Sequence, residues 1–317
     1  MNDSLTVRFL YKTSAGRLFL KVLQQTRFDR VMVRFLRSDI SRFIVPMYVK
    51  LNHVDLSDCE KKDFSSFRDF FMRKRVGMTT GIDFSIRSTS NRALDEEMTD
   101  DDEAVYGIVS KDAPGDSSGK TAEDETNLIS LCDGYLSAYK VRPDAHFTIK
   151  GMDYTVQDLA PGLESPGDDK STRFENGVCL IFRLCASDYH HYIYFDDCLQ
   201  GTHHYIEGEL NSVQNCACEA FPVYVRNRRT WSILKTAHFG DVLETEVGAF
   251  VVGGIVNHVE NNAVTRGDYK GHFDLSGSTI VLLFEKDKIV LDARLREGLK
   301  RGGEVRVRMG EKIGRRK

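Results

Sequence analysis

The chain has 317 residues, and its 44 Lys and Arg against 47 Asp and Glu give a formal net charge of −3. This near-neutral balance argues against a general nucleic-acid-binding protein, which would carry a basic excess, so no nucleic-acid partner is expected. An apolar fraction of 41% with 29% charged residues is typical of a globular core, and no apolar run is long enough to cross a bilayer.

Residues 1–50 are predicted to be helical and basic. Ten Lys and Arg stand there against three Asp, a local charge of +7. Phe28, Val31, Phe35 and Leu36 recur at helical spacing with arginines between them. A helix of this composition either covers a core or lies on an anionic lipid surface.

The cysteines and the N-terminus favour a reducing compartment. The seven cysteines are odd in number and contain no Cys-x-x-Cys pair, so free thiols are expected. Basic residues interrupt each N-terminal apolar stretch, and no signal-peptide cleavage pattern follows. We therefore expect the cytoplasm or the cytoplasmic face of a membrane.

The next two segments differ sharply in composition. Residues 51–78 are predicted to add further helix. Between residues 95 and 125, twelve acidic side chains are opposed by only two lysines, with Pro, Gly and Ser among them. This composition predicts a solvated, flexible insertion over residues 89–126.

From residue 127 onward the pattern changes to short β-like runs separated by Gly, Asn and Asp turn signals. Many short strands at close spacing favour a small barrel or a sandwich. The predicted fold class is therefore α+β, with a helical region at 1–88, the acidic insertion at 89–126 and a β-rich catalytic body at 127–317. The predicted strands include residues 136–141, 178–184, 203–206, 242–247, 250–256 and 279–285.

The most informative stretch is residues 271–285, where Gly277-Ser278-Thr279 leads directly into an apolar run. It could be an ordinary turn before a strand. Alternatively, the hydroxyl of Ser278 attacks the carbonyl of Gly277, because a residue without a Cβ leaves that approach open. Such a serine needs a neighbouring base to become a nucleophile.

Two places in the sequence could supply that base. Asp133 lies in an Asp-Gly turn just before a predicted strand, and His190 and His191 follow an apolar run. The pair His203-His204 raises the alternative of a metal site. No spacing here matches an established zinc pattern, so no metal ligand is assigned.

Together these segments resemble phosphatidylserine decarboxylase, a pyruvoyl-dependent, self-processing enzyme family. The resemblance covers residues 1–88 and 127–314 and excludes the acidic insertion. Its motifs occur in the family's order at residues 66–71, 132–134, 149–156, 188–190, 208–213, 247–253, 270–273, 277–279 and 309–314.

The resemblance implies a proenzyme in which Ser278 attacks the Gly277 carbonyl and divides the chain into residues 1–277 and 278–317. Ser278 would become a pyruvoyl group, the covalent cofactor. That group would form a Schiff base with the serine amine of phosphatidylserine and accept the electrons left by CO2, giving phosphatidylethanolamine.

The resemblance also implies site residues, with one departure from the family pattern. Asp133 would belong to the charge-relay set that activates Ser278. Many members carry Asp-Tyr-His-Arg-aromatic-His, whereas Ile193 stands here at the second His and His191 at the Arg. We therefore assign His190 as the base, with His191 as an alternative base or a substrate-binding residue.

The partners implied are phosphatidylserine, an anionic phospholipid surface, and the large and small chains of one precursor; a homodimer is compatible with them. The expected location is peripheral, on the cytoplasmic face of a bacterial cell membrane. Two other functions stay open. One is pyruvoyl-dependent decarboxylation of a soluble amino acid, and the other is lipid binding by an unprocessed paralogue, which the isoleucine at 193 motivates.

Overall fold

The structure is a computed structural model, and it describes residues 5–25, 28–76, 126–163, 170–249, 254–275, 278–300 and 303–317. The predicted acidic insertion at 89–126 lies outside the described residues, apart from its last residue. So do residues 250–253, at the start of one predicted strand, and Gly277.

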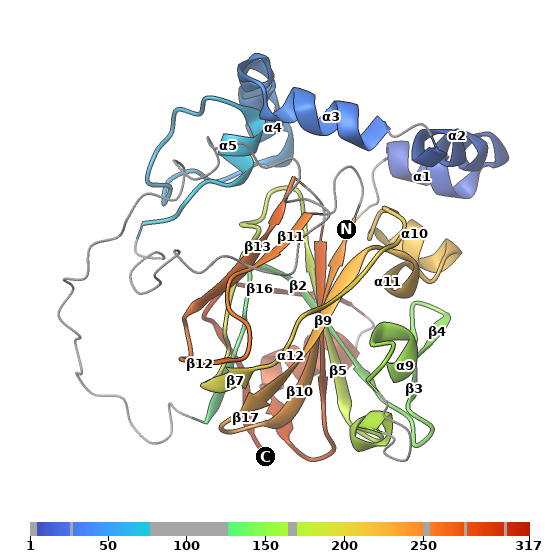
Figure 1. Cartoon of the computed structure of the whole chain (residues 1–317), viewed down its shortest axis with the longest axis vertical. Coiled ribbons are helices and arrows are strands. Elements are labelled where there is room, and N and C mark those ends of the chain that lie inside the picture. Colours follow the sequence, from blue (N-terminus) through green and yellow to red (C-terminus); the bar gives the residue numbers. More distant parts are fainter. Residues whose placement is uncertain are drawn as a thin grey trace.

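The N-terminal region is helical over most of residues 5–52, as its amphipathic spacing predicts. Figure 1 shows these helices gathered at one end of the molecule, over the β-rich body. They are α1 (Leu5–Lys12), α2 (Ser14–Gln25), α3 (Phe28–Arg37), the 3-10 helix η1 (Asp39–Ile44) and α4 (Val45–Asn52).

The prediction of further helix over residues 51–78 is largely wrong, because after α4 ends at Asn52 the described part of that segment contains one short helix, α5 (Phe67–Phe71). Between α4 and α5 the chain forms turns, one of which is closed by the Ser57 backbone N–H donating to Asp55 Oδ1 at 2.9 Å. Such side-chain bonds compete with helix formation. Helix α5 begins where Ser66 Oγ accepts from the Asp69 N–H at 3.1 Å, a normal N-cap.

The β-rich body is built around a nine-stranded sheet in which all neighbouring strands are antiparallel. Its strand order is β12-β7-β9-β10-β14-β5-β2-β16, with β8 beside β9. Within the described residues the sheet stays open, so the α+β class is confirmed but the barrel is not formed. The strands are β2 (Gly134–Lys140), β5 (Val178–Leu184), β7 (Cys198–Gln200), β8 (His204–Ile206), β9 (Arg229–Thr236), β10 (Gly240–Gly248), β12 (Asn262–Val264), β14 (Ser278–Phe284) and β16 (Val305–Val307).

Three smaller sheets and short helices complete the body. One is the sheet β11-β13-β6, in which β13 ends shortly before the predicted cleavage site; the others are β1-β17-β15 and β3-β4. Their strands are β1 (Asn127–Ile129), β3 (His146–Ile149), β4 (Met152–Thr155), β6 (His191–Ile193), β11 (Gly254–Asn257), β13 (Tyr269–Asp274), β15 (Ile289–Leu291) and β17 (Lys312–Arg316). The helices are α9 (Val156–Leu159), η2 (Lys170–Phe174), α10 (Asn215–Ala220), α11 (Val223–Arg226) and α12 (Ala293–Lys300).

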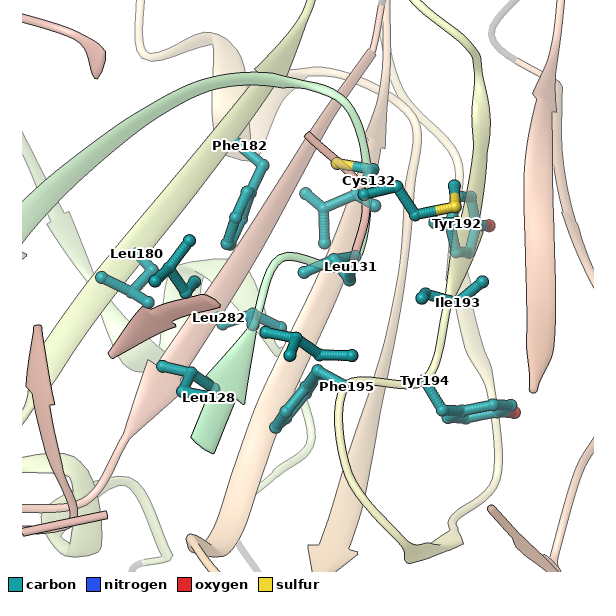
Figure 2. Packing of buried hydrophobic residues seen from close by; sticks show 14 of the residues in the cluster. Leu128, Leu131, Cys132, Leu180, Phe182, Tyr192, Ile193, Tyr194, Phe195 and Leu282 are labelled. Carbon is teal, nitrogen blue, oxygen red and sulfur yellow. The ribbon is translucent and has the colours of Figure 1, made fainter. Parts of the chain in front are cut away.

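Strand β14 is buried on both faces, which explains its continuous apolar sequence. Ile280 and Leu282 belong to a hydrophobic cluster on one face of the sheet, and Val281 and Leu283 to a second cluster on the other. Figure 2 shows Leu282 in the first cluster, among residues from several strands.

A third hydrophobic cluster joins the helical region to the body. It contains Val45 of α4, Phe67 and Phe71 of α5, and Leu275, which follows β13. The helices are also tied to each other, since Ser41 Oγ of η1 accepts from the Phe67 N–H at 2.8 Å. The helical region therefore packs directly against the segment that leads to Ser278. No helix among the described residues combines the length and apolar character needed to cross a membrane.

Candidate active site

Ser278 is the first residue of β14 and is completely buried. Its strand lies between β5 and β10, where Ser278 is opposite Leu184 on one side and Gly248 on the other. The strand ladder thus fixes the position of the Ser278 side chain, because both neighbours hold the backbone on which it stands.

His190 lies directly beside this hydroxyl. Its Nδ1 is 3.1 Å from Ser278 Oγ, and its Nε2 is 3.1 Å from the carbonyl oxygen of Cys185. A carbonyl can only accept, so Nε2 must carry the proton of the neutral ring. Nδ1 then presents its lone pair to the Ser278 hydroxyl, which is the orientation of a general base toward a nucleophile.

A turn over residues 185–188 shapes this arrangement. Asp188 Oδ2 accepts from the Cys185 N–H at 2.6 Å, and the Asp188 N–H donates to the Cys185 carbonyl at 2.9 Å. Arg306 holds the other carboxylate oxygen of Asp188 at 2.6 Å. The turn presents the Cys185 carbonyl to His190, and the Phe273 N–H of β13 donates to the His190 carbonyl at 2.9 Å.

The surroundings keep the His190 imidazole neutral. Burial, followed by the positive charge of Arg73, lowers the pKa of His190 to about 3, although the hydrogen bond to Cys185 and the charge of Asp133 act in the opposite direction. The ring of Phe71 covers the imidazole at a centroid distance of 4.3 Å. Near neutral pH the base form is therefore fully populated.

Asp133 is buried near this pair but does not hydrogen-bond to it in the described part of the chain. Its Oδ1 accepts from the Met309 N–H at 2.9 Å, and its Oδ2 pairs with Arg75 at 2.7 Å. Gly134 is required after it, because a Cβ there would lie 2.8 Å from the carbonyl oxygen of Arg183. The negative charge of Asp133 favours a higher pKa of His190, against the effect of burial, while its hydrogen bonds join the N-terminal segment to the C-terminal one.

His191 points away from Ser278, as expected for a neighbour of His190 in extended chain. Its Nδ1 lies 2.7 Å from the Tyr269 hydroxyl, which is also 2.8 Å from His272 Nδ1. The Tyr189 ring stacks on it at 4.4 Å. Burial, followed by the nearby His190, holds the pKa of His191 well below its usual range. His191 belongs to a second group of rings behind the site.

Ile193, at the position where the resemblance expects a second histidine, belongs to the first hydrophobic cluster. Figure 2 shows Ile193 among the packed residues of this cluster. This position therefore supplies packing and no proton-transfer group.

The fold brings to the site three residues for which the sequence predicts no individual role. Phe71 covers His190, and Arg75 pairs with Asp133. Arg73, only 2% exposed, donates through one guanidinium nitrogen to the carbonyls of Ser187 and Asp188 at 3.2 and 3.1 Å. Phe71 ends the family motif at residues 66–71, whereas Arg73 and Arg75 lie beyond that motif.

The second histidine pair has other contacts. His203 Nε2 lies 3.0 Å from the Val259 carbonyl, and the His204 ring stacks on Trp231 at 3.9 Å. In the described part of the chain, no group of three or more His, Cys, Asp or Glu side chains is arranged to hold a metal ion.

Comparison with known proteins gives a consistent result. The family model for phosphatidylserine decarboxylase matches residues 116–315. The chain is 34% identical over 310 residues to phosphatidylserine decarboxylase proenzyme 2 of Clostridium acetobutylicum, covering 97% of this chain and 91% of the relative. It is 33% identical over 314 residues to the phosphatidylserine decarboxylase proenzyme of Desulfitobacterium hafniense, with the same coverage of 97% and 91%.

Proposed function

The chain belongs to the phosphatidylserine decarboxylase family, and on this premise we propose that Gly277 and Ser278 form its self-cleavage site with His190 as the base. Its reaction is the decarboxylation of phosphatidylserine to phosphatidylethanolamine and CO2, as a carboxy-lyase made as a proenzyme. The 3.1 Å contact between His190 Nδ1 and Ser278 Oγ carries the assignment of residues.

In the proposed cleavage, His190 takes the proton of the Ser278 hydroxyl while Oγ attacks the carbonyl carbon of Gly277. The proton then passes to the departing backbone nitrogen of residue 278, so the amide becomes an ester. Loss of the Cα proton of residue 278 expels the Gly277 carboxylate and leaves a dehydroalanine. One water molecule then converts this residue into a pyruvoyl group and ammonia.

The family uses a pyruvoyl group, and the residues present fit its formation from Ser278. This hydroxyl is buried and faces a neutral imidazole nitrogen with a free lone pair. Once formed, the keto carbonyl supplies an electrophile for the serine amine and takes up the electron pair left by CO2. His190, whose ring lies beside Ser278 in the uncut chain, is the group that we propose transfers protons at this terminus.

The two chains are expected to stay together after cleavage. Strand β14 would begin the small chain, residues 278–317, and it is hydrogen-bonded on both sides to β5 and β10 of the large chain, residues 1–277. Both of its faces are buried. Association of these two chains needs no further partner, and the homodimer remains a prediction.

We further propose that η1 and α4 contact an anionic phospholipid surface, which makes the protein peripheral on the cytoplasmic face of a bacterial membrane. Their side chains Ile40, Phe43, Met47 and Leu51 are 68%, 73%, 64% and 75% exposed. Their spacing places them on one side of consecutive turns. Figure 1 shows β17 at the opposite end of the molecule, so one flat membrane would not touch the basic C-terminus as well.

Mass spectrometry of freshly purified chain tests the assignment. The expected result is a small fragment that begins at residue 278 with a keto terminus, together with CO2 release from phosphatidylserine vesicles. Ser278→Ala should stay whole, while the conservative control Thr279→Ser should be cleaved. An intact wild-type chain would favour the unprocessed lipid-binding paralogue. Turnover of free serine without vesicles would favour the decarboxylase of a soluble amino acid.

A further inference from the structure

The segment between β13 and Ser278 contains an unusual backbone conformation. Leu275 has a φ of 53°, in the left-handed region that glycine and asparagine enter readily and a branched side chain does not. Its side chain is only 5% exposed. Surrounding structure must hold a leucine in such a conformation, and backbone outliers of this kind gather at functional sites.

Asp274, the residue before it, is held by two arginines from separate helices. Arg68 Nε of α5 lies 3.2 and 3.1 Å from its two carboxylate oxygens. Arg37 of α3 lies 3.4 Å from the second oxygen. Asp274 is 6% exposed and the Arg68 side chain 17%, so the pair between them is largely shielded from solvent, whereas the Arg37 side chain is 31% exposed.

Leu275 is held by the same region of the chain. Its side chain packs in the third hydrophobic cluster with Val45, Phe67 and Phe71. The ion pairs of Asp274 and the apolar contacts of Leu275 therefore both come from the N-terminal helices. The body itself contributes the backbone pairing of Asp274 with Gly254.

We propose that Asp274 and Leu275 are positioning residues for self-cleavage, held by the N-terminal helices so that the chain leaves β13 toward the cleavage site with Leu275 constrained in the left-handed region. The inference rests on the proposed cleavage between Gly277 and Ser278. Cleavage frees the chain end at Gly277, so the constraint matters before the cut. These two residues should therefore affect the rate of cleavage more than the turnover of chains already cleaved.

The experiment follows cleavage of newly synthesised full-length chain by denaturing electrophoresis. Asp274→Asn and Arg68→Gln should slow cleavage by about tenfold or more, since a small displacement of reacting groups costs that much. Arg68→Lys keeps the charge and should recover part of the rate, and Arg37→Gln should have a smaller effect. The control Arg226→Gln removes a remote, exposed pair with Glu209 and should cleave like wild type.

Leu275→Ala and Leu275→Gly separate backbone constraint from packing. Both remove nearly the same side chain, but only glycine enters the left-handed region freely. If the constraint promotes cleavage, the glycine variant should be several-fold slower than the alanine variant. Thermal unfolding of each substitution in a Ser278→Ala chain shows whether a slow variant is folded.

The possible failures are distinguishable. A wild-type chain that is never cut overturns the proposed function itself. A wild-type chain that is cut, with Asp274→Asn at the same rate and the Leu275 variants equal to each other, overturns only the positioning role. If Asp274→Asn does not fold, Arg68→Lys and the two Leu275 variants decide the question.

Discussion

The Phe71 ring of the N-terminal region lies 4.3 Å from the His190 imidazole, centroid to centroid, with 31° between the ring planes. One residue of helix α5 thus excludes water from the side chain that contacts Ser278. Helix α5 therefore belongs to the site although it is far from His190 in the sequence. Its Phe71 contributes to the burial of His190, and burial is the largest influence on the pKa of that histidine.

The Phe71→Ala variant should show this effect directly. Water reaching His190 should raise its pKa from about 3 toward the ordinary value of 6.5, so cleavage should become sensitive to pH between those limits. The cavity should also cost about 3–5 kcal/mol of stability. Phe64→Ala is the control, because Phe64 packs in the same cluster against Phe70. It should lose stability without the change in pH profile, measured as cleavage rate against pH.

His190→Ala and His191→Ala should differ strongly in cleavage. Only His190 contacts Ser278, and loss of a general base costs about 10²- to 10⁴-fold in rate. His191 contacts Tyr269 instead, so its loss should act mainly on stability. Time courses of cleavage for both variants make the comparison. Normal processing by His190→Ala would show that the base is assigned to the wrong residue.

Asp133→Asn and Arg75→Gln test whether Asp133 acts by charge or by structure. Either change breaks the buried pair at 2.7 Å, but only Asp133→Asn removes the negative charge that favours protonated His190. If the charge of Asp133 promotes cleavage, Asp133→Asn should slow cleavage more than Arg75→Gln does, even where the two variants lose the same free energy of unfolding. Equal rates would leave Asp133 with a structural role alone. Cleavage time courses and urea unfolding supply the two measurements.

Acid should destabilise the fold through buried neutral histidines. Burial, followed by Lys270, lowers the pKa of His203 to about 4, whereas an unfolded histidine titrates near 6.5. Its contribution is therefore complete above pH 6.5 and is lost as the pH falls from there toward 4. For this residue the loss between pH 7.5 and pH 5 is about 2 kcal/mol. Urea unfolding at both pH values should show a smaller drop for His203→Gln.

Replacement of Phe43 and Met47 by Glu should weaken binding to phosphatidylserine vesicles by tenfold or more. The double change removes two exposed apolar side chains and adds two charges that an anionic surface repels. Leu199→Glu, at a residue of β7 that is 45% exposed, is the matched control. Vesicle co-sedimentation measures binding. Equal binding by both proteins would exclude η1 and α4 as the contact surface.

Much of the fold could be predicted because its signals are local. The apolar run of β14 reflects burial on both faces, and the amphipathic spacing near residues 28–36 matches α3, in which Val33 and Leu36 are partly buried while Val31 and Phe35 are exposed. Neither pattern indicates which other segment packs against the element, because hydrophobic periodicity shows only which side of a helix or strand is apolar. The packing of Phe67 and Phe71 on Leu275 was therefore invisible in the sequence, as was the open edge of the central sheet.

The sequence by itself determined the family resemblance and the Gly277-Ser278 step, because the order of motifs and the residue types are properties of the chain. The resemblance favoured His190 over His191 as the base, and only the tertiary structure shows that the His190 ring lies beside Ser278. Neighbouring residues of extended chain point to opposite sides, and the side that faces Ser278 depends on how β6, β13 and β14 come together. Only folding brought Phe71 to His190, Arg75 to Asp133 and Arg68 to Asp274, since these contacts join parts of the chain that no local pattern connects.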